Sequence, residues 1–345
     1  MKRTSLLSQR LIPLSVVAVV VLTASTGRTA DIPDKTDPAK VVGAESCTKC
    51  HKSELAALDA SRHHGSLTKM GEGNAAKFIA AVGGKKDMCI KCHATPKGDR
   101  AIQAVSGVSC ESCHGGAADW LEIHGKEGVA QADRHAGADE GGMIRSSNVY
   151  TIAKNCFNCH VVFNEKLVNE GHPASNKIEF LGWSTGEMRH NFQKDQKNNA
   201  DAPSAWAEYA SGKTQDRRRL KLVVGHLVDL EVCLTNLGKV TNGKGDFAKG
   251  NSKRAKAALG EVEDIADDLD DAAPPELNAA IKAAKALGRF SSISVKAKQI
   301  KAAPAAAASV AKAAAAISGK YDGSTFGDID GMVGKAKPKG TPYSP

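Results

Sequence analysis

Residues 203–345 repeat apolar side chains at helical spacing. In 219–237 the apolar positions lie three or four residues apart, as at Leu220, Val223, Val224 and Leu227, which places them on one face of an α-helix. The same pattern predicts helices over 247–269 and 276–287. We therefore expect an α-helical bundle over residues 203–326.

Proline and glycine mark the expected ends of these helices. Pro274 and Pro275 precede one helix, and proline is well tolerated in a first helical turn. Pro304 is expected to open an Ala-rich helix that runs to about Ser318 and ends at Gly319. Residues 327–345 are rich in Gly, Lys and Pro and are expected to form a flexible tail.

Residues 41–200 have no such pattern but carry a repeated motif. Cys-x-x-Cys-His is the attachment signature of a c-type haem, in which both thiols bind the haem covalently and the His is the proximal iron ligand. Zinc sites or disulfides would not require a His after every second Cys. The motif occurs four times, with Cys47, Cys50 and His51, with Cys89, Cys92 and His93, with Cys110, Cys113 and His114, and with Cys156, Cys159 and His160.

Four haems would also supply a hydrophobic core. Aromatic residues are only 4% of the chain, and the motif region has few long apolar runs. A domain of that composition cannot fill a core from side chains alone, so we expect it to be unfolded or molten without its cofactor. The predicted fold class is all-α, with a tetrahaem cytochrome c domain over residues 41–200, little regular sheet, and the C-terminal bundle.

The N-terminus is typical of an export signal. Lys2, Arg3 and Arg10 precede an apolar stretch over 11–22, and small residues follow. Residues 1–30 are therefore expected to be a signal peptide cleaved between Ser25 and Ala30, with an uncleaved anchor as the alternative. Covalent haem attachment outside the cytoplasm agrees with a periplasmic location. No later membrane span is expected.

The net charge of +9 is weak support for nucleic-acid binding. Four of the positive charges lie in the expected signal peptide, and subtracting them leaves +5. Haem propionates would lower the charge further, so no nucleic-acid partner is expected. Arg217, Arg218 and Arg219 could form a docking patch for an acidic partner, although a solvated helix face is the simpler interpretation.

Histidines outside the motifs are candidates for the second axial ligand of each iron. Eleven His less four proximal ones leave seven, a surplus that favours bis-His ligation over His/Met. These seven residues are His63, His64, His124, His135, His172, His190 and His226.

Residues 41–190 resemble the tetrahaem cytochrome c-554 family, whose members accept electrons from hydroxylamine oxidoreductase. In both, a His follows the first motif His by twelve residues, here His63. The stretch 108–115 (VSCESCHG) is similarly followed by His124. The motif order and the short interval between the second and third motifs also agree.

The resemblance implies three bis-His haems and a five-coordinate second haem. It implies that His124 is the distal ligand of the first haem and His63 that of the fourth. The third haem's distal His comes after the last motif in the family, and here His172 and His190 compete for that role. Both could be ligands, and the second haem would then be six-coordinate.

The other polar candidates have simpler interpretations. His64 adjoins His63 and is expected at the surface or behind the ligands, and His135 is expected in a loop. His226 shares a helical stripe with Cys233, so both are expected in the bundle core, although Cys233 could cross-link a dimer.

The sequence thus predicts a periplasmic electron carrier with four covalently attached haem c groups. Its expected partners are redox proteins such as hydroxylamine oxidoreductase or a quinol-linked cytochrome. The alternative is an enzyme that reduces a small nitrogen oxide at an open second haem. That chemistry would use His93 as the proximal ligand.

Overall fold

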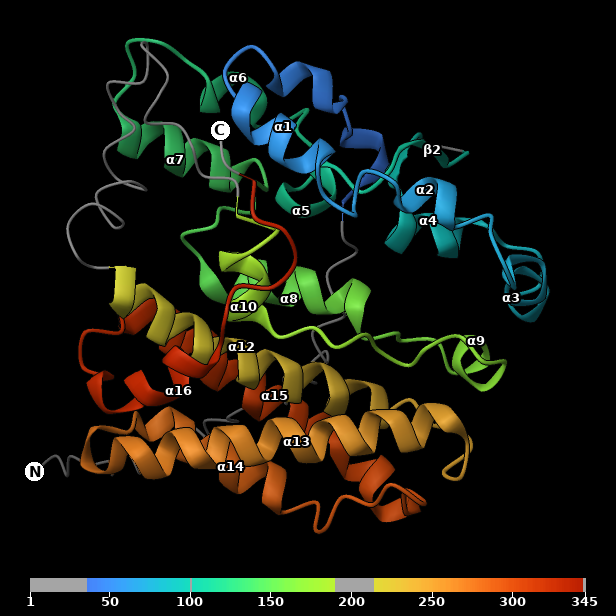
Figure 1. The fold of residues 1–345 in the computed structure, drawn as a ribbon, viewed down its shortest axis with the longest axis vertical. Helices are drawn as coiled ribbons and strands as arrows, with labels where there is room; N and C mark the ends of the chain where they lie inside the picture. The colour runs from blue at the N-terminus through green and yellow to red at the C-terminus, as the bar shows by residue number, and fades with distance from the viewer. Residues whose placement is uncertain (1–35, 100, 190–213, 344–345) are drawn as a thin grey trace, which may run out of the picture.

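The structure is a computed structural model that describes residues 36–99, 101–189 and 214–343. The expected signal peptide and His190 lie outside these residues. Short helices at one end of the molecule carry the first three motifs, and long helices form the other end (Figure 1). The all-α prediction is confirmed, because the described residues contain a single two-stranded antiparallel sheet, formed by β1 (Thr95–Lys97) and β2 (Gln103–Ser106).

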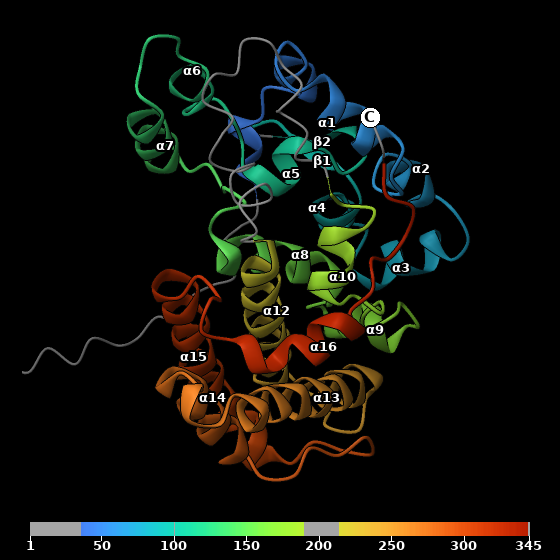
Figure 2. The same ribbon diagram turned by 60° about the vertical axis from the view of Figure 1, so that its left-hand side comes forward.

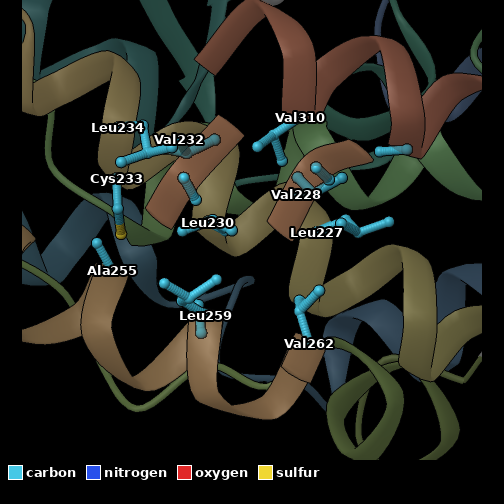
Figure 3. Close-up of a cluster of buried hydrophobic side chains, with 14 of the residues drawn as sticks. Leu227, Val228, Leu230, Val232, Cys233, Leu234, Ala255, Leu259, Val262 and Val310 are labelled. Atoms are coloured by element: carbon cyan, nitrogen blue, oxygen red, sulfur yellow. The ribbon is translucent and has the colours of Figure 1, made fainter. Parts of the chain in front are cut away.

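Four helices make the C-terminal bundle. Helix α12 lies at its centre and packs against both α13 and α15, and α14 packs against α15 (Figure 2). The apolar stripe of α12 is fully buried at Leu227, Val228 and Leu230, and Figure 3 shows these side chains facing α13 and α15. The bounds are α12 Thr214–Leu237, α13 Asp246–Leu269, α14 Pro275–Lys285 and α15 Ala297–Lys320.

Of the two helix starts predicted from prolines, one is confirmed and one is wrong. Pro275 lies in the first turn of α14, as expected. Helix α15 instead begins at Ala297, so Pro304 lies inside it. The proline ring needs room opposite it, and Gly238, directly after α12, provides that room, since a Cβ there would lie 2.7 Å from Pro304 Cγ. This tertiary fit outweighs the local preference for proline at a helix start.

One helix of the described residues, α15, is long and apolar enough to cross a membrane. Its Ala-rich composition accounts for that, although no span after the signal peptide is expected from the sequence. In the structure one face of α15 is buried against α12 and α14, so a core helix of the bundle explains the same property.

Residues 327–343 differ from the loose tail that we expected. They form η5 (Gly327–Ile329) and α16 (Asp330–Lys335), and Ile329 and Val333 are fully buried against the bundle. Arg219 holds this segment through Asp330, with Nε–Oδ1 2.7 Å and Nη2–Oδ2 2.6 Å. The neighbouring Arg217 and Arg218 likewise donate to backbone carbonyls, so internal contacts account for the arginine patch.

The motif-bearing half is built from short helices joined by loops. None of them is long enough to form a core of its own. Contacts between the motif segments hold these helices in place. They are η1 Pro38–Lys40, η2 Ala44–Cys47, α1 Lys52–Asp59, α2 Ser66–Lys69, α3 Ala75–Ala81, α4 Asp87–His93, α5 Cys110–His114, α6 Leu121–His124, α7 Gln131–Glu140, α8 Val149–His160, α9 Glu165–Asn169 and α10 Phe180–Thr185.

The hydrophobic core of the bundle extends into residues expected to belong to the motif region. Phe157 of α8 and Leu181 of α10 are buried in the same cluster as the α12 side chains. By contrast, the separate cluster around Trp120 contains only three buried side chains, the others being Ala117 and Ala138. The bundle therefore packs directly onto the helix that carries the fourth motif.

Candidate functional site

Each of the last three motifs forms the C-terminal turn of a helix. Helices α4, α5 and α8 end at His93, His114 and His160. Residues three and four apart lie on one side of a helix, so the two Cys and the His of each motif face the same way. The first motif begins at Cys47, the last residue of η2, and His51 is the N-cap residue of α1.

Three motif histidines face a second imidazole that is remote in sequence. The His51 and His124 ring centroids are 6.1 Å apart, and the ring planes are nearly parallel, inclined by 17°. The His63 and His160 centroids are 5.9 Å apart.

The third pair involves the second motif. The ring of His172 faces that of His93, with centroids 6.3 Å apart and planes at 75°. Phe78 of α3 lies edge-on to His172 at 5.3 Å and helps to orient it. His172 therefore faces the second motif rather than the third, for which the family pattern had made it a candidate.

These separations fit an iron ion between each pair of rings. A metal–nitrogen bond of about 2 Å, and about 1.1 Å from that nitrogen to the ring centre, give a centroid separation of about 6.2 Å for two axial imidazoles. The three pairs lie at 5.9–6.3 Å.

Unpartnered polar atoms around the first motif also fit a bound group. Trp120 Nε1 and His124 Nδ1 are buried without a hydrogen-bond partner among the described residues, and their rings meet at 5.7 Å. Burial lowers the pKa of His124 to about 4, and the nearby His51 adds to the shift. A neutral imidazole is the form that binds a metal.

The outer nitrogen of three motif histidines has a polar neighbour. His114 Nδ1 lies 2.7 Å from Ile144 O, and His160 Nδ1 contacts the side-chain amide of Asn176. His51 Nδ1 is 3.7 Å from Glu54 Oε2. Such partners fix the orientation of a metal-bound imidazole and alter its basicity.

The four motifs form one connected series. The Cys47 and Cys110 thiols are neighbours: Cys110 raises the pKa of Cys47, and burial raises it further. Asn155, directly before the fourth motif, donates to Cys113 O of the third at 2.7 Å. Cys159 Sγ lies 3.9 Å from Lys91 O of the second. The second and third motifs are neighbours as well, because Thr95, two residues after His93, hydrogen-bonds to Ser112 inside the third motif at 2.9 Å.

Ser66 joins the ligand-bearing segments of two motifs. Its Oγ lies 2.7 Å from His63 O and 2.8 Å from His93 O, and it accepts the Val108 N–H at 2.9 Å. Gly107 makes this approach possible, since a Cβ there would lie 2.6 Å from His63 O.

Glu111, inside the third motif, organises the first. Its side chain is fully buried. Oε1 accepts the N–H groups of Val42 and Ala117 at 2.9 and 2.8 Å, and Oε2 accepts that of Gly43 at 2.7 Å. Hydrogen bonds to a carboxylate are stronger than neutral ones, so Glu111 fixes the segment that leads into Cys47.

Replacing Glu111 with Ala should lower the free energy of unfolding by about 2–3 kcal/mol, because three N–H groups, two of them buried, lose their acceptor. Urea denaturation of the purified protein measures this. The control is Glu122→Ala on the exposed side of α6, which should leave the value unchanged. Equal effects of the two substitutions would contradict the role given to Glu111.

The remaining polar candidates lie away from the ring pairs. His64 is exposed and pairs with Asp59 at 3.0 Å. His135 lies in α7 rather than in a loop, with Nδ1 3.3 Å from Arg145. His226 is on α12, and burial lowers its pKa to about 4. Cys233 is fully buried, with its sulfur toward Ala255 (Figure 3), which leaves it unable to cross-link two chains as packed.

Four pairs of Cys, each followed by a His and three of them in a helical turn, define a c-type cytochrome, in which haem is bound covalently. Residues 46–115 match the family described as Cytochrome c554 and c-prime. The match covers the first three motifs, confirms the family resemblance for that segment, and supports an electron carrier. No curated protein matches the chain, and no solved structure does.

Sequence reasoning missed several residues that organise this site. Ser66, Asn155 and Asn176 act through contacts between segments far apart in the chain, and no local pattern distinguishes them. Glu111 offered a weak signal, because it is a charged residue inside a haem-attachment motif, whose other residues must lie close to a haem.

Proposed function

We propose that this protein is a periplasmic tetrahaem c-type cytochrome that relays electrons between redox proteins. The observation that carries the proposal is the connected series of four motifs, three of which face a second imidazole at 5.9–6.3 Å. Neighbouring low-spin haems exchange electrons with little nuclear rearrangement, and the protein supplies their spacing, ligands and environment.

The distal ligands in this proposal are His124 for the first haem, His172 for the second and His63 for the fourth. His190, outside the described residues, is then the remaining candidate for the third. A sixth ligand on the second haem removes the open site that a nitrogen-oxide reductase would need. We therefore prefer the carrier function to the enzyme.

Contacts between the motifs suggest the electron path. The first and third motifs share the Cys47–Cys110 thiol contact, and the fourth contacts both the third and the second. Cys50 is exposed, whereas the other motif cysteines are half-buried. The first haem is therefore where we expect a redox partner to exchange electrons.

The test is to purify the exported protein and to count its haems and their spin states. We expect four covalent haems per chain, a ferric spectrum that is entirely low-spin, and no binding of cyanide or nitric oxide. Fewer than four haems would contradict the tetrahaem assignment. A high-spin fraction near one haem in four would favour the alternative function, an enzyme with an open second haem.

The carrier function itself requires electron exchange with a partner. Stopped-flow mixing with hydroxylamine oxidoreductase plus hydroxylamine, or with a quinol-reduced cytochrome, should reduce the haems rapidly. Failure of both classes of donor to reduce a fully loaded protein would count against a relay between them. A small-molecule reductant that reduces all four haems is the control for a competent sample.

A further inference from the structure

A charged side chain of the bundle reaches the segment that follows the fourth motif. Arg254, in the middle of α13, donates from Nη1 to Asn176 O at 2.8 Å and to Ser175 Oγ at 3.3 Å. Its Nη2 donates to Ile178 O at 2.9 Å. One guanidinium thus binds two backbone carbonyls and one side-chain hydroxyl within residues 175–178 of the motif-bearing half.

The guanidinium is itself fixed on its other side. Its Nε donates to Asp229 Oδ1 of α12 at 2.6 Å, and both side chains are largely buried, at 14% and 13% exposure. It also lies over the ring of Phe157, inside the fourth motif, at 5.6 Å. The planar fork of an Arg can hold all these partners at once, which the single ammonium of a Lys cannot.

Backbone hydrogen bonds hold the segment bound by Arg254 beside the fourth motif. The Asn176 N–H donates to His160 O at 3.2 Å, and the Val162 N–H donates to Ala174 O at 2.8 Å. The side-chain amide of Asn176 contacts Nδ1 of His160. The path from the bundle to the proximal ligand therefore contains one residue, Asn176, whose carbonyl binds Arg254 and whose side chain binds His160.

The chemistry of that contact follows from the tautomer of the ring. With iron at Nε2, the proton of His160 is on Nδ1. The structure places Nδ2 of Asn176 at Nδ1, while Oδ1 accepts the Ile178 N–H at 3.1 Å, so the amide turns over when haem is bound and presents its oxygen to that proton. An acceptor at Nδ1 makes the imidazole a stronger electron donor, which favours the ferric iron. The contact therefore lowers the reduction potential of the haem that His160 binds.

We infer that Arg254 is a positioning residue for the fourth haem: it holds Asn176 against His160 and so lets the helical bundle set the reduction potential of that haem. The inference rests on the proposed tetrahaem function and assigns a role to the half of the chain that has no haem motif. It predicts that a bundle residue without any contact to a motif His changes the electronic properties of one haem alone.

The test is spectroelectrochemical titration of the holoprotein and three variants, with low-spin electron paramagnetic resonance. Asn176→Leu should raise one of the four potentials, with a change of about tenfold in the reduction equilibrium, which is about 59 mV for one electron. Asn176→Asp should lower the same potential. Arg254→Lys keeps the positive charge beside Asp229 and should move the same potential in the direction of Asn176→Leu.

The matched control is Arg219→Lys. Arg219 is also an arginine of the bundle, and it binds the carboxylate of Asp330 through two nitrogens. It contacts the C-terminal segment 327–343 and not the segment that follows the fourth motif. It should leave all four potentials unchanged. Hydrogen exchange should be faster at residues 174–178 in Arg254→Lys and unaffected there in Arg219→Lys.

The outcomes separate this inference from the proposed function. Four haems in the wild-type protein with unchanged potentials in both Asn176→Leu and Arg254→Lys would overturn the inference and leave the relay intact. Equal shifts of all four potentials would also overturn it. A wild-type protein with fewer than four haems would overturn the proposed function instead, before any variant is compared.

Discussion

Replacing His172 with Ala should convert one of the four ferric haems from low to high spin. His172 faces His93 with ring centroids 6.3 Å apart, and two axial imidazoles give an iron the strong ligand field of a low-spin centre. Without His172 the second iron keeps one axial protein ligand, so about one haem in four should become high-spin. Magnetic circular dichroism measures that fraction.

The low-spin signal that disappears should also be recognisable. The His93 and His172 planes are inclined by 75°, whereas those of His51 and His124 are inclined by 17°. Nearly perpendicular imidazoles leave two iron d orbitals close in energy, which makes the paramagnetic signal strongly anisotropic. We therefore expect His172→Ala to remove an anisotropic signal and His124→Ala a more rhombic one.

The variant should also acquire ligand binding. One cyanide or nitric oxide per chain should bind to His172→Ala and none to the wild type. The control is His64→Ala, since His64 is exposed and bound to Asp59, and its spectrum should not change. An unchanged spectrum in His172→Ala would remove this residue from the ligand set and would return the second haem to the open state that the family pattern implies.

Replacing Lys154 with Met should lower the free energy of unfolding by about 3–5 kcal/mol, because it leaves a buried charge without its partner. Lys154 Nζ lies 2.8 Å from Glu231 Oε1, and the two side chains are 8% and 5% exposed. Tyr150 completes the group, with its hydroxyl 3.3 Å from the same carboxylate. This pair fastens the fourth-motif helix, α8, to α12. Urea denaturation of the holoprotein measures the loss.

An exposed ion pair supplies the control. Lys285 Nζ lies 2.8 Å from Glu263 Oε1, the same distance, but the Lys285 side chain is 63% exposed. Lys285→Met should leave the free energy of unfolding unchanged, because water screens exposed charges. Adding Glu231→Leu to Lys154→Met should restore most of the loss. Equal losses for Lys154→Met and Lys285→Met would contradict this account.

The loss in Lys154→Met should depend on pH. Burial already raises the pKa of Glu231 above its usual 4.5, and Lys154 opposes that shift. Removing Lys154 therefore leaves a folded-state pKa that is higher still. A raised carboxyl pKa means that the folded protein binds more protons than the unfolded one, so its stability increases as the pH falls. The deficit should be largest at neutral pH and should shrink as Glu231 becomes protonated.

Local sequence was enough for the helices of the bundle. The period of Leu220, Val223, Leu227 and Leu230 reflects a helix with one buried face, and these side chains are indeed buried. It failed at Pro304, where the start of α15 depends on the facing Gly238. A proline's effect on a helix depends on what packs against it, which a single segment does not reveal.

The candidate site was likewise predicted only in part from the sequence. The motifs predicted where haem is attached, because both thiols and the proximal His lie within one helical turn. They could not predict which distant imidazole faces which motif. His172 follows the fourth motif in sequence but faces the second, because residues 161–178 are folded back between the bundle and α3.

The sequence by itself determined the covalent chemistry, the class of protein and the helical pattern of the bundle, because each depends on residues a few positions apart. Only the tertiary structure decided the contacts between the motifs, the opposing imidazoles and the link from Arg254 through Asn176 to His160. Those features join segments tens of residues apart, and their geometry arises only when the whole chain is packed.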